Sequence, residues 1–160
     1  MYSFPQNIKG CAASYGTSSR SGKALAMPPI FGTAVLAINV LFCLFTAWSS
    51  AAEPEGFAAK LGLGIVSAGG LNEVRAQYSG FFVAVAAVCI ASLCGLLSRQ
   101  TSFVVMVAVY GGLLAGRLVS LALNAGVAGY GPTILALYAI DALGLVLAVA
   151  SLVLDRRSTA

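Results

Sequence analysis

Residues 132–154 read PTILALYAIDALGLVLAVASLVL, an apolar run in which Asp141 is the one charged residue. At a helical rise of about 1.5 Å per residue, the run is long enough to cross the roughly 30 Å hydrocarbon core of a bilayer. In lipid every backbone polar group must be bonded internally, and a helix does this within one segment. The run therefore predicts a transmembrane helix.

Three further apolar runs of similar length precede this one. Of the 160 residues, 59% are hydrophobic and only 9% are charged, whereas a soluble domain carries about 25% charged residues. The sequence thus predicts an all-α, integral membrane four-helix transmembrane bundle that forms one domain over residues 28–155. The expected spans are 30–52, 72–98, 102–124 and 132–154.

The connections between the runs predict an antiparallel up-down order. The polar link at residues 98–101 is so short that the helices on either side of it must be antiparallel neighbours. The outer-side segment 53–71 is longer, and Phe57, Leu61 and Ile65 recur in it every four residues, which predicts a short amphipathic helix. This helix lies either in the membrane interface or against the bundle, and the sequence leaves both open.

Four spans place both ends of the chain on one side of the membrane, and most cations gather there. Because positive loops stay inside, that side is predicted to be cytoplasmic. Residues 1–27 then form a flexible cytoplasmic tail and 156–160 a cytoplasmic C-terminus. The cations on this side are Lys9, Arg20, Lys23, Arg99, Arg156 and Arg157, against Lys60 and Arg75 on the other.

The first span also has features of a signal peptide. Lys23 precedes it, and the small residues Ser49, Ser50 and Ala51 suit a signal peptidase. Its apolar stretch exceeds the 7–15 residues typical of a signal peptide. We therefore expect an uncleaved helix, with cleavage as the alternative.

Two ionisable residues, Arg117 and Asp141, lie within the apolar runs. A charge near the bilayer centre costs at least about 2.5–3.5 kcal/mol, so it needs a structural or functional reason. Arg117 lies nine residues before Gly126, and Asp141 lies nine residues after Pro132. Each is then roughly 13 Å below the outer turn, and their equal heights predict an ion pair between adjacent helices.

Other polar residues are expected near this pair. They form one predicted cluster in the outer half of the bundle, which serves either as a binding pocket or ion path, or as a polar lock that fixes helix order. The sequence leaves both interpretations open. The cluster comprises Glu73, Arg75, Gln77, Tyr78, Arg117, Asn124, Tyr138 and Asp141.

Small residues suggest where helices approach closely. Gly112 and Gly116 form a G-x-x-x-G motif, whose partner is a helix of this bundle or of another protein. Gly80, Gly95 and Gly144 are predicted to be packing notches as well.

The sequence supplies no pattern for catalysis or for a metal site. It has no His, no C-x-x-C pair and no phosphate-binding loop, and its basic residues show no nucleic-acid footprint. Most of its cysteines fall in apolar runs, where Cys acts as a small buried hydrophobe. No catalytic residue, metal ligand or cofactor is assigned, and no nucleic-acid partner is expected.

Residues 70–80 read GLNEVRAQYSG. This stretch resembles the opening of the second helix in a family of small bacterial membrane proteins known as domain of unknown function 4345. Gly116-Arg117 is similar to a Gly-Arg of the family's third helix, and Asp141 stands where the family has an acidic residue, more often Glu. The resemblance covers about residues 30–155 and implies a four-helix domain of the bacterial inner membrane with no assigned biochemistry. It draws attention to Glu73, Arg75, Arg117 and Asp141.

Three functions are compatible with these features. The first is a non-enzymatic accessory or assembly subunit of a larger membrane complex or homo-oligomer, which small size and many small residues favour. The second is a binding protein or transporter for a small molecule or lipid that uses the cluster around Arg117 and Asp141. The third is a membrane enzyme acting on a lipid or quinone with Glu73 or Asp141 as acid or base, which no other motif supports.

Overall fold

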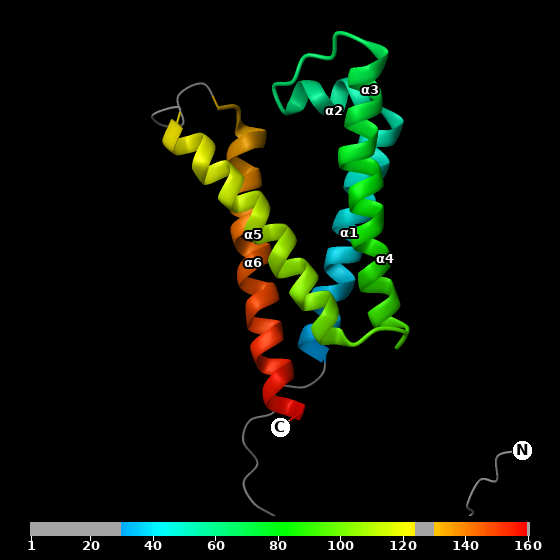
Figure 1. Cartoon of the computed structure of the whole chain (residues 1–160), viewed down its shortest axis with the longest axis vertical. Coiled ribbons are helices and arrows are strands. Elements are labelled where there is room, and N and C mark those ends of the chain that lie inside the picture. Colours follow the sequence, from blue (N-terminus) through cyan, green and yellow to red (C-terminus); the bar gives the residue numbers. More distant parts are fainter. Residues whose placement is uncertain (1–29, 124–129, 160) are drawn as a thin grey trace, which may run out of the picture.

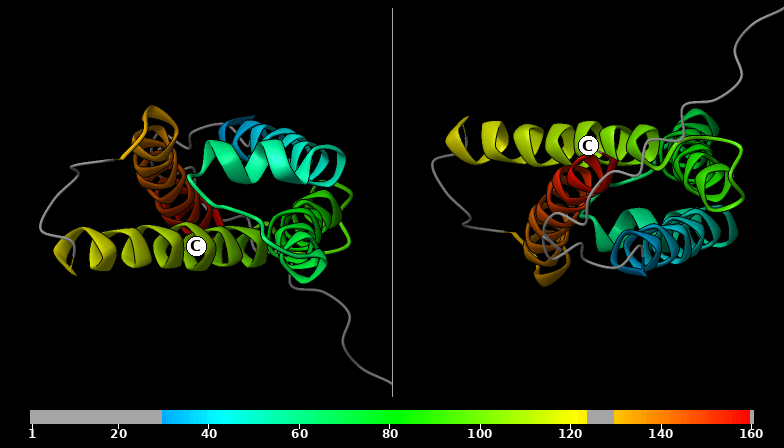
Figure 2. Two further views of the ribbon diagram at one scale, coloured as in Figure 1. Left: turned by 90° about the horizontal axis from the view of Figure 1, so that it is seen from above. Right: turned by 90° about the horizontal axis from the view of Figure 1, so that it is seen from below.

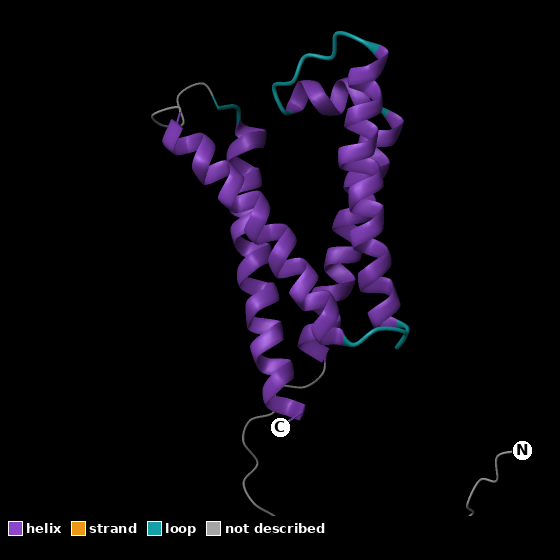
Figure 3. Ribbon diagram, viewed as in Figure 1, coloured by secondary structure: helices purple, strands orange, loops and turns teal. Residues whose placement is uncertain are grey.

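The computed structural model describes residues 30–123 and 130–159, and these residues form helices and connecting loops without a β-strand (Figure 3). One of the helices, η1, is a π-helix that continues directly into α4. In chain order the elements are α1 (Ile30–Ala52), α2 (Pro54–Lys60), α3 (Ala68–Val74), η1 (Arg75–Gly80), α4 (Phe81–Leu93), α5 (Arg99–Leu123) and α6 (Pro132–Thr159).

Four helical stretches among the described residues are long and apolar enough to cross a membrane. Many large apolar side chains point outward on them, and Trp48, for example, is 74% exposed. In water such a surface would be costly, whereas in lipid it is the ordinary exterior. The prediction of an all-helical protein with four helices long and apolar enough to span a membrane is thereby confirmed for the described residues. The stretches are Ile30–Ala52, Ala68–Leu93, Arg99–Leu123 and Pro132–Arg157.

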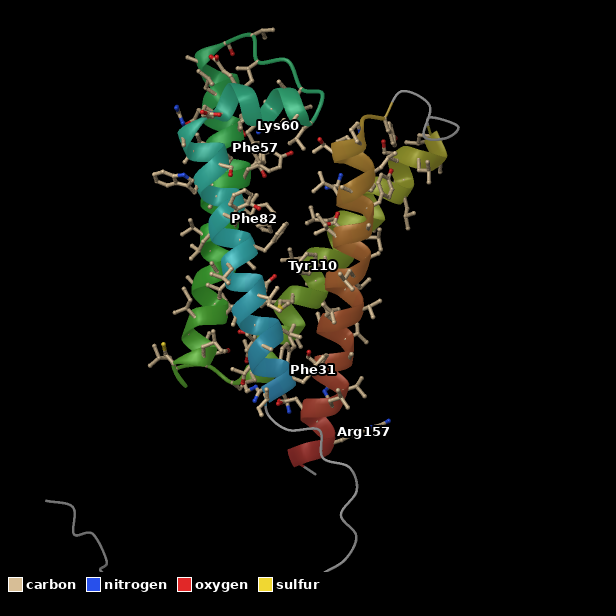
Figure 4. The ribbon with its side chains drawn as sticks, turned by 180° about the vertical axis from the view of Figure 1, so that it is seen from behind. Phe31, Phe57, Lys60, Phe82, Tyr110 and Arg157 are labelled. Atoms are coloured by element: carbon tan, nitrogen blue, oxygen red, sulfur yellow. The ribbon has the colours of Figure 1, made fainter. Side chains whose placement is uncertain are left out.

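The four long helices form two pairs, α1 with α4 and α5 with α6 (Figure 1). The pairs meet at one end, where Phe31 and Arg157 lie, and diverge toward the other (Figure 4). We call these the closed end and the open end. Seen from above, α2 extends from α1 across the opening toward α6 (Figure 2).

The closed end is held by close packing and by polar contacts between the pairs. A buried apolar cluster joins α1, α4, α5 and α6 there, with Leu36 and Phe103 fully buried. A Cβ at Gly32 would meet the end of the Arg99 side chain and, at 3.0 Å, the ring of Phe103, so both side chains of α5 pack against this glycine. Arg99 is also 3.7 Å from Asp155 at the end of α6.

The second span ends earlier than predicted, at Leu93 instead of residue 98. Gly95 has a φ of 75°, a left-handed conformation that glycine adopts without strain. The amide of Leu96 donates to the carbonyl of Ala91, and that of Gly95 donates to Ser92, which is the Schellman helix end. Gly95 is therefore a helix terminator, and its predicted role as a packing notch is wrong.

The predicted amphipathic helix is present, but it is shorter than the spacing of its apolar residues suggested. Helix α2 stops at Lys60, because Gly62 at a φ of 74° closes it in the same way as Gly95 closes α4. Phe57 lies on this helix and Leu61 caps it, whereas Ile65 falls in the loop that follows.

Candidate functional site

The centre of the site is an ion pair between α5 and α6. Arg117 Nε donates to Asp141 Oδ2 at 2.6 Å. The side chain of Asp141 is only 4% exposed, whereas that of Arg117 is 23% exposed. The pair predicted from equal depths along two helices is therefore formed, and Arg117 is its more accessible member.

Arg117 is held in place by Tyr138 of the neighbouring helix. The Tyr138 hydroxyl donates to the Arg117 carbonyl at 2.8 Å, and the guanidinium carbon lies 5.8 Å from the centre of the Tyr138 ring. Tyr130 stacks on Tyr138 with ring centroids 6.3 Å apart. A cation over an aromatic face is stabilised further where water is scarce.

The guanidinium of Arg117 has more hydrogen-bond donors than the described residues accept. It carries five N–H groups, and Nε makes its one hydrogen bond to the described part of the chain. The two terminal amino groups form the forked edge that binds a carboxylate or phosphate through two parallel hydrogen bonds. An acceptor for this edge must therefore come from outside these residues.

A cavity of about 490 Å³ lies between the two helix pairs on the open side. Its wall is mainly aromatic and aliphatic, and Arg117 and Asp141 lie in it together with Gln77. We call this cavity the aromatic lobe. It is lined by Phe42, Phe45, Thr46, Phe57, Lys60, Leu61, Gln77, Tyr78, Phe81, Phe82, Tyr110, Leu113, Arg117, Thr133, Leu137 and Asp141.

A second cavity of about 800 Å³ adjoins the first. We call it the polar lobe, because hydroxyl groups, glycines and two cations form much of its wall. Lys60, Leu61, Leu113 and Arg117 line both lobes, which makes the two cavities neighbours along one wall. The polar lobe is completed by Ala59, Gly62, Gly112, Gly116, Ser120, Tyr130, Gly131, Ile134 and Tyr138.

Helix α2 covers the cavities at the open end. Phe57 packs on Tyr78 of η1 with ring centroids 5.0 Å apart. Phe57, Phe82 and Tyr110 all lie between the two helix pairs, and Lys60 lies near the opening (Figure 4). Among the described residues Lys60 has no ion-pair partner, so its charge is available to whatever occupies the lobes.

The predicted polar cluster is brought together only in part. Arg117, Asp141 and Tyr138 are in direct contact, and Gln77 and Tyr78 line the same aromatic lobe. Glu73 and Arg75 are exposed and line neither lobe. Asn124 lies outside the described residues.

The structure supports one of the predicted glycine packing notches and not the others. A Cβ on Gly144 would lie 2.7 Å from the ring of Tyr110, so Gly144 does provide a notch for that ring. A Cβ on Gly80, Gly112 or Gly116 would meet nothing within 4 Å. These three glycines are therefore not packing notches among the described residues. That the G-x-x-x-G motif packs against a helix of another protein stays a prediction.

A hydrogen-bonded network nearer the closed end was not foreseen from the sequence. The Tyr110 hydroxyl donates to Asn39 Oδ1 at 2.6 Å, and Asn39 Nδ2 donates to Cys89 Sγ at 3.3 Å. The network joins α5, α1 and α4. Asn39 is the one amide side chain in the predicted span 30–52, and this could have pointed to the network. A strongly polar group in a membrane span usually has a structural or functional partner.

The lining of the cavities was predicted only at some of its polar residues. The sequence predicted Lys60 only as a charge on the outer side of the membrane. It gave no reason to distinguish the aromatic residues of α1 and α4 from the other apolar residues of their spans. The rings of Phe42 and Phe82 pack edge to face, with their centroids 6.3 Å apart. Both rings line the aromatic lobe, whose width depends on how far the two helix pairs diverge, and no local sequence pattern encodes that distance.

No family model matches the chain, and no curated protein and no solved structure matches it either.

Proposed function

We propose that the protein binds a lipid-soluble amphipathic molecule in the cavity between its two helix pairs. The observation that carries this proposal is the aromatic lobe, about 490 Å³ in volume, with an incompletely bonded guanidinium in its wall. Ligand sites are typically cavities of about 300–1,000 Å³, mostly apolar, with a few polar groups that orient the ligand. Of the functions compatible with the sequence, binding of a small molecule or lipid fits this geometry best.

Quenching of tryptophan fluorescence tests the proposal. Trp48 is the one native tryptophan and is 74% exposed, so it reports on bulk lipid. A Phe57→Trp variant in a Trp48→Phe background reports on the aromatic lobe. A brominated long-chain alcohol should quench the Phe57→Trp reporter saturably, and its unbrominated counterpart should compete. Quenching that rises in proportion to the added alcohol, as at Trp48, contradicts a binding site.

A second candidate is the accessory subunit of a larger membrane complex. It is favoured by Gly112 and Gly116, where no described neighbour approaches, because such a motif accepts a close helix from another protein. Extraction in mild detergent followed by native mass measurement separates the candidates. Defined protein partners support the subunit, whereas a lone chain that retains a lipid supports the binding protein.

We further propose that the closed end faces the cytoplasm of a bacterial inner membrane, in an antiparallel up-down topology with both termini inside. The support is the distribution of Lys and Arg, and the resemblance of residues 70–80 to domain of unknown function 4345. Cys94 is exposed between α4 and α5. As the sole cysteine, it should react with a membrane-impermeant maleimide in inverted vesicles and not in intact cells. A Ser67→Cys variant on the opposite loop should show the reverse, and labelling of Cys94 in intact cells contradicts the orientation.

A further inference from the structure

The two lobes differ in chemistry while sharing part of their wall. Aromatic rings dominate one, and hydroxyl groups and glycines are prominent in the other. An amphipathic molecule has the same division, with an apolar chain and a polar head. A ligand whose chain fills the aromatic lobe would carry its head into the polar lobe, past the residues common to both.

The charges at the shared wall specify the sign of that head. Lys60 and Arg117 line both lobes, and Asp141 lines only the aromatic one. Asp141 is 4% exposed and already bonded to Arg117 Nε. These three residues carry a net charge of +1, and the groups without a partner among the described residues are the Lys60 ammonium and the two terminal amino groups of Arg117.

Those two groups suit a phosphate. Phosphate oxygens accept hydrogen bonds from both terminal amino groups of an arginine, while an ammonium group acts as a second point charge. Basic pockets between transmembrane helices hold the heads of anionic lipids in this manner. The bilayer around the protein supplies such lipids directly to a cavity whose walls come from two diverging helix pairs (Figure 1).

We infer that the ligand is an anionic phospholipid, with its phosphate between Lys60 and Arg117 and one acyl chain in the aromatic lobe. This inference rests on the proposed function, because it names the class of molecule for the same cavity. A zwitterionic phospholipid has the same phosphate but adds an ammonium group, which the net positive charge of the site disfavours.

The Phe57→Trp reporter separates the inference from the proposed function. The protein is placed in phosphatidylcholine vesicles and titrated with either phosphatidylglycerol or phosphatidylcholine that carries the same brominated chain. Quenching by phosphatidylglycerol that saturates at a mole fraction about fivefold or more below that at which phosphatidylcholine quenches equally supports the inference. Equal affinities overturn the anionic preference and leave the binding function intact. If neither lipid quenches the reporter, no acyl chain enters the aromatic lobe and the inference is overturned, while the brominated alcohol decides the proposed function separately.

Two charge variants test whether the preference is local. Lys60→Gln should reduce the preference for phosphatidylglycerol about fivefold. Arg75→Gln removes a cation from the same end of the protein, but Arg75 lines neither lobe, so the preference should be unchanged. Equal losses in the two variants mean general attraction to a charged surface and contradict the site. Tight quenching by a brominated fatty acid that displaces phosphatidylglycerol would assign the site to a free carboxylate instead.

Discussion

Two polar groups hold helices together, one between the two helix pairs and one within the α5–α6 pair, and they are bonded in different ways. In the Asn39–Tyr110–Cys89 network, the Tyr110 hydroxyl, the Asn39 carbonyl oxygen and the Asn39 amide all have partners within the chain. In the Arg117–Asp141 pair, the guanidinium uses one donor and faces two cavities. Polar groups in lipid thus lock helices together where the chain itself supplies the acceptors. The donors of Arg117 that exceed those acceptors are the ones that the proposed ligand would bind.

The largest effect is expected from breaking the ion pair on one side only. Arg117→Leu leaves the Asp141 carboxylate buried without a counter-charge, which should lower the free energy of unfolding by about 3–5 kcal/mol. Asp141→Leu added to Arg117→Leu should recover most of this loss, because no charge is then stranded. Thermal unfolding in detergent measures both variants. An Arg117→Leu protein as stable as the wild type would show that Asp141 is not desolvated.

A smaller loss is expected where α5 and α6 pack closely on each other. In Gly144→Ala, the new methyl group would lie 2.7 Å from the ring of Tyr110, and such overpacking costs about 1–3 kcal/mol. Gly112→Ala is the matched control, because a Cβ there meets nothing within 4 Å. The unfolding temperature should fall for the first and not for the second. Equal shifts would contradict the close contact between α5 and α6 at Gly144.

The smallest loss is expected from the network itself. Asn39→Ala removes two hydrogen bonds, and interhelical hydrogen bonds in membranes contribute about 1 kcal/mol each or less. Asn39 lines neither lobe, so saturable quenching of the Phe57→Trp reporter should persist. An Asn39→Ala variant that keeps its stability but loses lipid binding would contradict the structural role of the Asn39 network and make it part of the binding site.

The sequence predicted the helices well because each span is encoded locally. The length of each apolar run defines its span. The Arg117–Asp141 ion pair was predicted because each residue lies nine positions from the turn between the two helices, which places both at the same depth. Errors arose where one residue's backbone conformation decides the end of a helix. The left-handed glycines Gly62 and Gly95 ended α2 and α4 earlier than hydrophobicity alone suggested.

The cavities were harder to predict, because their shape depends on how two helix pairs pack. Lys60 and Phe57 lie on a short helix whose placement over the opening follows from tertiary structure (Figure 2). Glu73 and Arg75 were included in the polar cluster because they lie near the outer end of the second helix, where Glu73 and Gln77 would share one face of an α-helix. Only Gln77 and Tyr78 line the aromatic lobe, and the π-helix η1, which begins at Arg75, changes the helical register between Glu73 and Gln77.

Native mass spectrometry of the protein released from its own membrane tests most directly whether the open side is a ligand site. It compares the wild type with the Arg117→Leu, Asp141→Leu double variant, which is expected to fold. The wild-type protein should retain an anionic phospholipid that the folded double variant lacks. Identical lipid adducts on both proteins, or none on either, would contradict the ligand site and reduce the ion pair to a structural lock like the network at Asn39.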